Sequence, residues 1–72
     1  MLKSLLRDVR ERAGLRQVDL AEEIGRPQSF ISEYEAGQRR LDLVELREVC
    51  LACGITLRKL VNEYERRLTQ LR

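Results

Sequence analysis

The run from residue 17 to residue 37, QVDLAEEIGRPQSFISEYEAG, constrains the fold of this chain more than any other segment. Its first part carries apolar side chains at the spacing of one helix face, at Val18, Leu20, Ala21 and Ile24. Gly25 ends this helix, and Pro27 stands where a second helix begins, because its fixed φ suits a first helical turn. The run therefore predicts a pair of short helices joined by a tight turn.

The second helix of this pair has one apolar and one polar face. Ile31 and Tyr34 are expected to face inward. The opposite face carries short hydrogen-bonding groups, at Gln28, Ser29, Ser32 and Glu33. A polar face without bulky groups suits a helix that enters the major groove of DNA. The segment 17–37 is therefore predicted to be a helix-turn-helix unit, whose second helix reads base edges.

Helical periodicity also covers the segments on either side. A helix is expected from about residue 2 to residue 13, ending at Gly14, with its inward side chains at Leu6, Val9 and Ala13. Asp42 and Glu45 form a capping-box pattern that begins another helix, with an apolar face of Leu46, Val49, Cys50 and Cys53. Thr56 is the expected N-cap of a last helix. No strand pattern interrupts this order, so the prediction is one all-α domain over residues 1–72.

These residues also carry a family resemblance. Over about residues 5 to 61 the chain resembles the phage-repressor and Cro type of DNA-binding domain, often called XRE-type, at Arg10, Gly14, Leu15, Gln17, Leu20, Ala21, Gly25, Glu35 and Gly37. The resemblance implies a five-helix, lambda-repressor-like fold that binds double-stranded DNA. It also implies that Arg10 and Glu35 form a partly buried ion pair, which orients the reading helix without touching DNA.

Base reading is assigned to the polar face of the second helix. Gln28 can bond N6 and N7 of adenine together, and the resemblance implies that Gln28 and Ser29 both contact base edges. Ser32 and Glu33 lie one turn later on the same face. Glu33 either accepts from cytosine N4 or repels a badly docked phosphate. The alternative for all these residues is an ordinary solvated helix face.

Phosphate contacts are assigned to residues around the two helices. Gln17 resembles the family's phosphate anchor at the start of the first helix, where free N–H groups favour an anion. Arg16 replaces the usual Ser, Thr or Asn cap, which costs on the order of 1 kcal/mol and adds a cation beside the phosphate. Arg26, Arg39 and Arg40 are expected to hold the DNA backbone on either side.

The formal charge of +2 makes the placement of charges more informative than their sum. Arg26, Arg39 and Arg40 cluster around the reading helix in sequence, whereas the acidic residues are expected elsewhere, at Glu22, Glu23, Glu45, Glu48 and Glu63. Phe30 is expected to pack under the turn between the helices, the alternative being a contact with a thymine methyl or a sugar.

Helix-forming sequence continues beyond the resemblance, over residues 62–72. Apolar residues there follow the three-four rhythm of a coiled-coil seam, at Val61, Tyr64, Leu68 and Leu71. Leu2 and Leu5 offer a counterpart that the ordinary core is not expected to bury fully. The hypothesis is that this helix mediates homodimerisation, and the alternative is that it folds back on the first helix of its own chain. A dimer would read a pseudo-palindromic site with half-sites about 34 Å apart.

Other classes of site find little support. The chain has no His, which removes the usual general base and the commonest metal ligand. Cys50 and Cys53 form a C-x-x-C pattern, but a single pair does not complete a zinc site, and both fall on an apolar helix face. Core packing is the preferred interpretation and a redox pair the alternative. The expectation is that the protein is not an enzyme and uses no metal or cofactor.

No stretch resembles a transmembrane helix or a signal peptide, so the expected location is cytoplasmic. If Met1 is the true start, the chain is a free-standing reader without a ligand-sensing domain. The preferred function is a sequence-specific transcriptional repressor of prokaryotic or phage type. A restriction–modification controller would look the same. The alternatives of a different kind are an antitoxin whose C-terminal helix binds a toxin protein and an adaptor that never touches DNA.

Overall fold

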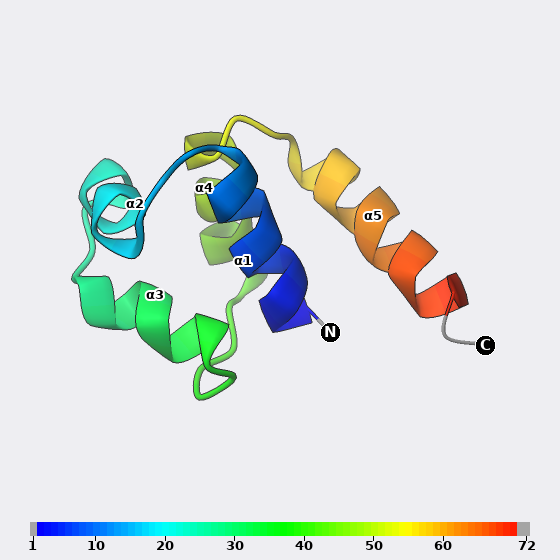
Figure 1. Ribbon diagram of the computed structural model, residues 1–72, viewed down its shortest axis with the longest axis horizontal. Helices are drawn as coiled ribbons and strands as arrows, with labels where there is room; N and C mark the ends of the chain where they lie inside the picture. Colours follow the sequence, from blue (N-terminus) through cyan, green and yellow to red (C-terminus); the bar gives the residue numbers. More distant parts are fainter. Residues whose placement is uncertain (1, 71–72) are drawn as a thin grey trace.

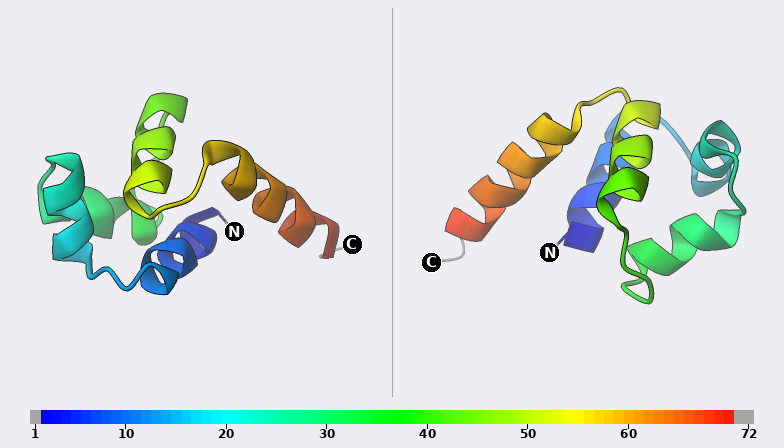
Figure 2. Two further views of the ribbon diagram at one scale, coloured as in Figure 1. Left: turned by 90° about the horizontal axis from the view of Figure 1, so that it is seen from above. Right: turned by 180° about the vertical axis from the view of Figure 1, so that it is seen from behind.

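The computed structural model describes residues 2–70, which form helices α1 (Leu2–Arg12), α2 (Gln17–Ile24), α3 (Gln28–Glu35), α4 (Leu43–Ala52) and α5 (Leu57–Gln70). Helix α2 packs against α3 and α4, and α1 packs against α3. Helix α5 packs on α4 and lies at the opposite end of the molecule from α2 and α3 (Figures 1 and 2). Within residues 2–70 there is no strand, and the predicted all-α, five-helix fold is confirmed.

The helices begin at the predicted caps. The Asp42 carboxylate accepts from the Glu45 N–H at 2.7 Å, and the Glu45 carboxylate accepts from the Asp42 N–H at 2.9 Å, which completes the capping box of α4. Thr56 Oγ1 accepts from the Lys59 N–H at 3.1 Å and so caps α5. At α2 the Arg16 side chain makes no cap bond. The Asp19 carboxylate accepts from the Arg16 N–H at 2.9 Å, so half of a capping box survives there.

The end of α1 differs from the prediction. The helix stops at Arg12, and Ala13, which was expected to face the core, is exposed. Ala13 falls in the turn before Gly14, whose φ is 75°, and this turn directs its side chain away from the core.

The core draws side chains from all the helices. The largest fully buried ones are Leu5, Leu20, Ile31, Leu60, Val49 and Cys50. Phe30 is also buried and packs edge-on against Tyr34, with ring centroids 5.6 Å apart, as the packing prediction required. Cys50 and Cys53 are free and buried, and burial raises the pKa of Cys50 to about 11. This environment keeps the Cys50 thiol protonated, which fits core packing and opposes redox chemistry.

The predicted dimer contact is wrong at Leu5. This residue was expected to remain partly outside the core, but it is 0% exposed and sits among the core residues of its own chain. Leu2 is half-buried and packs against the same core. The reason is that the core includes α5, whose Leu60 is buried in the same cluster as Leu5. Leu5 is therefore not available to a second copy of the chain.

The Tyr34 hydroxyl is buried without a hydrogen-bond partner among residues 2–70. Burial raises the pKa of Tyr34, so the hydroxyl stays protonated and its unmade hydrogen bond opposes folding. We expect Tyr34→Phe to leave the fold intact and to raise the free energy of unfolding by up to about 1 kcal/mol. Urea denaturation followed by circular dichroism measures this change. A decrease of about 1 kcal/mol or more in the free energy of unfolding would show that the hydroxyl has a hydrogen-bond partner in solution.

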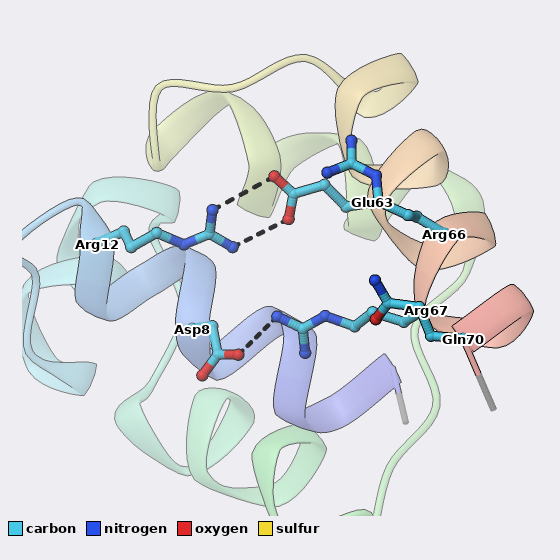
Figure 3. A pocket seen from close by; sticks show the side chains of 6 residues that line it. All are labelled: Asp8, Arg12, Glu63, Arg66, Arg67 and Gln70. Carbon is cyan, nitrogen blue, oxygen red and sulfur yellow. Dashed lines mark hydrogen bonds and ion pairs between the residues drawn. The ribbon is translucent and has the colours of Figure 1, made fainter.

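Helix α5 folds back along α1 of its own chain. Leu60 enters the core and the half-buried Tyr64 packs against it. Two ion pairs join α5 to α1: Arg12 NH2 lies 2.9 Å from Glu63 Oε2, and Arg67 NH2 lies 2.7 Å from Asp8 Oδ2 (Figure 3). Both pairs line an open groove of about 440 Å³ between the helices. No helix in residues 2–70 is long and apolar enough to span a membrane.

Because polar contacts hold the outer half of α5, its attachment should depend on pH. The hydrogen bond from Arg12 lowers the pKa of Glu63 below its ordinary 4.5. The stabilisation is therefore complete above pH 4.5 and is lost as the pH falls through the lowered value. Exposed pairs of this kind contribute about 1 kcal/mol or less, so the loss is local.

We expect hydrogen exchange of the α5 amides beyond Glu63 to speed up severalfold between about pH 5 and pH 3, after correction for the intrinsic rate. Amides in α3 should keep their protection over this range. The variant Glu63→Gln should show fast corrected exchange at every pH. If it keeps the pH dependence of the parent, Glu63 is not the group that holds α5.

Candidate nucleic-acid interface

The turn between α2 and α3 sets the direction of the reading helix. Gly25 has a φ of 69°, a conformation that L side chains rarely adopt. With this geometry the Arg26 N–H donates to the Ala21 carbonyl at 3.0 Å and closes α2. Pro27, with a φ of −67°, precedes the first residue of α3. The result is a helix-turn-helix in which α2 and α3 pack against each other (Figure 1).

The predicted reading face of α3 points to solvent. Gln28, Ser29 and Glu33 are exposed, while Ile31 and Tyr34 on the other side are buried. Ser32 is half-buried, and its hydroxyl donates to the Ser29 carbonyl at 3.2 Å. The structure thus brings all four predicted residues to one face, with the Ser32 hydroxyl already bonded inside the helix.

A chain of hydrogen bonds runs from the reading face into the core. Gln28 Nε2 donates to Gln17 Oε1 at 3.5 Å, and Gln17 Nε2 donates to Glu35 Oε1 at 3.1 Å. Glu35 in turn accepts from Arg10 Nε at 2.8 Å and from Arg10 NH2 at 3.0 Å. Gln17, predicted as a phosphate anchor, therefore also links the first residue of α3 to the side chain at its end.

The link between Arg10 and Glu35 is buried, with side chains 10% and 1% exposed. The hydrogen bond to Glu35 raises the pKa of Arg10. Arg10 NH1 also donates to the Leu15 carbonyl at 2.8 Å, which fixes the loop before α2. Arg7 Nε lies 3.7 Å from Glu35 Oε1, a contact that was not predicted from the sequence. The sequence feature that indicates this contact is the spacing of three residues between Arg7 and Arg10, which places both on one helix face.

The other predicted phosphate-binding residues differ in their surroundings. Arg16 Nε and NH2 each lie 3.0 Å from an Asp19 oxygen, and these bonds help to lower the pKa of Asp19 to about 2. Arg40 is exposed and has no ion pair with any residue in 2–70. Arg40 is thus the predicted phosphate-binding arginine whose charge is not paired within the described chain.

The prediction that the acidic residues lie away from the reading helix is wrong near Arg26 and Arg39. Glu45 was expected away from the reading helix, but its Oε2 lies 3.2 Å from Arg26 NH1 and 3.1 Å from Arg39 NH2. Glu48 was also placed elsewhere, yet its Oε2 lies 3.7 Å from Arg26 NH2. The capping box explains this difference, because it holds Glu45 at the N-terminus of α4, next to the turn that carries Arg26.

Comparison with known proteins agrees with this geometry. Residues 4–63 match the family model of the helix-turn-helix domain. A solved structure described as an XRE-family-like protein from Pseudomonas syringae pv. tomato str. DC3000 is 40% identical in sequence. It superposes with a TM-score of 0.84 over 90% of this chain and 79% of that chain. This chain belongs to the XRE-type helix-turn-helix family.

The XRE-type domain also resembles the crystal structure of the clp gene regulator ClgR from Corynebacterium glutamicum. That chain is 26% identical, and the TM-score is 0.86 over 97% of this chain and 74% of that one. No curated protein matches the chain. The XRE-type family is one of DNA-binding transcriptional regulators, and α3 is the second helix of the helix-turn-helix. Among residues 2–70, no group of three His, Cys, Asp or Glu is arranged to hold a metal ion.

Proposed function

We propose that this XRE-type protein is a sequence-specific transcriptional repressor that binds a pseudo-palindromic operator as a homodimer. The observation that carries the proposal is the placement of Gln28, which is exposed at the start of α3 and joined through Gln17 to the buried pair of Glu35 and Arg10. A side chain held in this way loses less conformational freedom when it bonds a base. It therefore discriminates better between bases than a freely rotating one.

The reading face divides into roles. Gln28 bonds adenine at two points, and Ser29 contacts the neighbouring base edge. Glu33 lies on the same exposed face and accepts from cytosine, while Ser32 contributes surface. Contacts to the DNA phosphates set the register of the protein on the duplex. The residues assigned to these contacts surround this face and are Arg16, Gln17, Arg26, Arg39 and Arg40.

Although α5 lies along α1 of its own chain, the proposed dimer contact uses apolar side chains of α5 that stay exposed or half-buried. Val61 is apolar and 43% exposed, and Leu68 is half-buried on the same helix. Tyr64 and Leu2 border this surface from the core, Leu5 is excluded by its burial, and Leu71 lies outside the described residues. A dimer that reads a pseudo-palindromic site must hold its two reading helices about 34 Å apart, one helical turn of DNA.

Selection of bound duplexes from a random DNA pool tests DNA reading. We expect enrichment of an inverted repeat whose half-sites are one helical turn apart, about 10 base pairs from centre to centre. Enrichment of a single half-site would support the reading and contradict the dimer. Absence of any enrichment would contradict the repressor proposal and favour a protein partner for α5.

Sedimentation tests the dimer contact. The chain has a mass of 8.5 kDa, and we expect the parent protein to sediment at twice this mass. Val61→Lys should sediment as a monomer, because a charge would enter the apolar contact. Asn62→Lys is the matched control, since its position is the exposed neighbour and gains the same charge. A Val61→Lys protein that stays dimeric would rule out this surface.

A further inference from the structure

Four side chains form a compact group at the edge of the reading helix. Arg26 comes from the turn before α3, Phe30 from the first turns of α3, Arg39 from the loop after it and Glu45 from α4. The guanidinium carbon of Arg26 lies 4.6 Å from the centroid of the Phe30 ring, and that of Arg39 lies 4.8 Å from it. Both arginines reach the same oxygen, Oε2 of Glu45. We call this group the Phe30 cluster.

The carboxylate in this cluster is itself held in place. Glu45 uses its other oxygen, Oε1, to accept from the Asp42 N–H in the capping box of α4, and its side chain is only 12% exposed. The backbone hydrogen bond from Asp42, with help from the arginines, lowers the pKa of Glu45, so it is charged at neutral pH. One fixed carboxylate, Glu45, therefore pairs with both cations beside α3.

We propose that Glu45 is a positioning residue for DNA reading, which holds Arg26 and Arg39 against Phe30 and withholds part of their charge from the DNA backbone. The proposal rests on the DNA-binding function above. An arginine bonded to a carboxylate must give up that bond, or share it, before it neutralises a phosphate. Contacts to phosphate supply most of the affinity for any DNA sequence, so this restraint lowers non-operator binding. Phosphate contacts are shared by operator and non-operator DNA, so the restraint lowers the affinity for both and leaves the contacts of Gln28 to bases unaffected.

The geometry favours this role over a simple surface ion pair. The two arginines approach the aromatic ring as well as one carboxylate, which fixes each guanidinium at more than one point. Arg40, by contrast, follows Arg39 directly and has no ion pair with any residue in 2–70. The loop thus carries one paired cation beside one unpaired cation, and the difference between them is set by Glu45.

Glu45→Gln is the informative variant. A Gln at this position still accepts from the Asp42 N–H, so the capping box survives while the negative charge is lost. Glu48→Gln is the matched control, because it removes the same charge one turn later on α4, where the oxygen is 3.7 Å from Arg26 and is not paired with Arg39. Affinity for a selected operator and for a scrambled duplex is measured between about 50 and 200 mM salt.

We expect Glu45→Gln to steepen the salt dependence on scrambled DNA by about 2 per subunit, since each added phosphate contact contributes about 0.9 to the slope. Because phosphate contacts carry no sequence information, affinity for the operator should rise together with that for scrambled DNA. Glu48→Gln should change the slope by less than half as much. A merely structural role of Glu45 would lower affinity without steepening the slope. Equal slopes in the parent and Glu45→Gln, with the operator still bound, would overturn the proposal and leave the DNA function standing.

A measurement without DNA separates the two proposals. Nuclear magnetic resonance of the arginine guanidinium N–H groups, including NH1 of Arg26 and NH2 of Arg39, reports on their hydrogen bonds directly. We expect the signals of Arg26 and Arg39 to move in Glu45→Gln and those of Arg10 and Arg16 to stay. Unchanged Arg26 and Arg39 signals would overturn the cluster itself. Moved signals in a protein that binds no DNA would confirm the cluster, while the repressor proposal and the role of Glu45 in reading would both fall.

Discussion

Replacement of Glu35 by Leu should lower the free energy of unfolding by roughly 3–5 kcal/mol, the usual cost of stranding one charge of a buried pair. The Arg10 guanidinium would lose both of its carboxylate bonds while remaining 10% exposed. Gln17 would also lose the acceptor of its amide. Single domains are stable by only about 5–15 kcal/mol, so this variant should unfold at markedly lower urea concentration than the parent. Urea titration followed by circular dichroism measures the loss.

The double variant Arg10→Met with Glu35→Leu is the control. It leaves no buried charge without a partner, so we expect it to recover most of the lost stability. Recovery would show that the single variant suffers from the stranded charge and not from lost packing volume. A double variant as unstable as the single one would contradict this account and would place the importance of Glu35 in its shape.

Replacement of Gln28 by Ala should weaken binding to the selected operator by about 1–3 kcal/mol, or roughly 5- to 150-fold. The side chain is exposed, so the free energy of unfolding should change by no more than about 0.5 kcal/mol. Affinity for a scrambled duplex should stay the same, because Gln28 is assigned to a base and not to a phosphate. Fluorescence anisotropy with both duplexes measures the two affinities.

Gln38→Ala is the matched control for this variant. It removes the same amide from an exposed position just beyond α3, away from the reading face. We expect it to bind the operator like the parent. The operator affinity of Gln17→Ala should lie between those of Gln28→Ala and Gln38→Ala. This variant removes the acceptor of the Gln28 amide but leaves the base contact itself possible. If Gln28→Ala binds the operator as tightly as Gln38→Ala, base reading by Gln28 is wrong.

The sequence was enough for features that depend on neighbours along the chain. Gly25 and Pro27 marked the turn before α3, and Asp42 with Glu45 marked the start of α4, because caps and turns act within a few residues. The reading face followed from the helical period in the same way. The ion pair of Arg10 with Glu35 spans 25 positions and came from the family resemblance, not from spacing.

Contacts between side chains from separate helices could not be predicted from the sequence. Arg26 and Glu45 are 19 positions apart, and no periodicity connects a turn residue to a capping residue on a later helix. Gln17 was expected to meet only a phosphate, because its bonds to Gln28 and Glu35 exist only once α2 and α3 have packed. Leu5 was misjudged for a similar reason: how much of it the core covers depends on α5, whose Leu60 is buried in the same cluster.

The hydrogen-bond chain from Gln28 to Arg10 restricts how this protein can acquire a new operator. A substitution at Gln28 changes the bases read and also removes a donor from a chain that ends in the buried ion pair. Ser29 and Glu33 are exposed and stand outside that chain, so they can vary without disturbing it. Selection for altered operators should therefore first yield variants at these positions, with Gln28 retained as the shared anchor of a family of related half-sites.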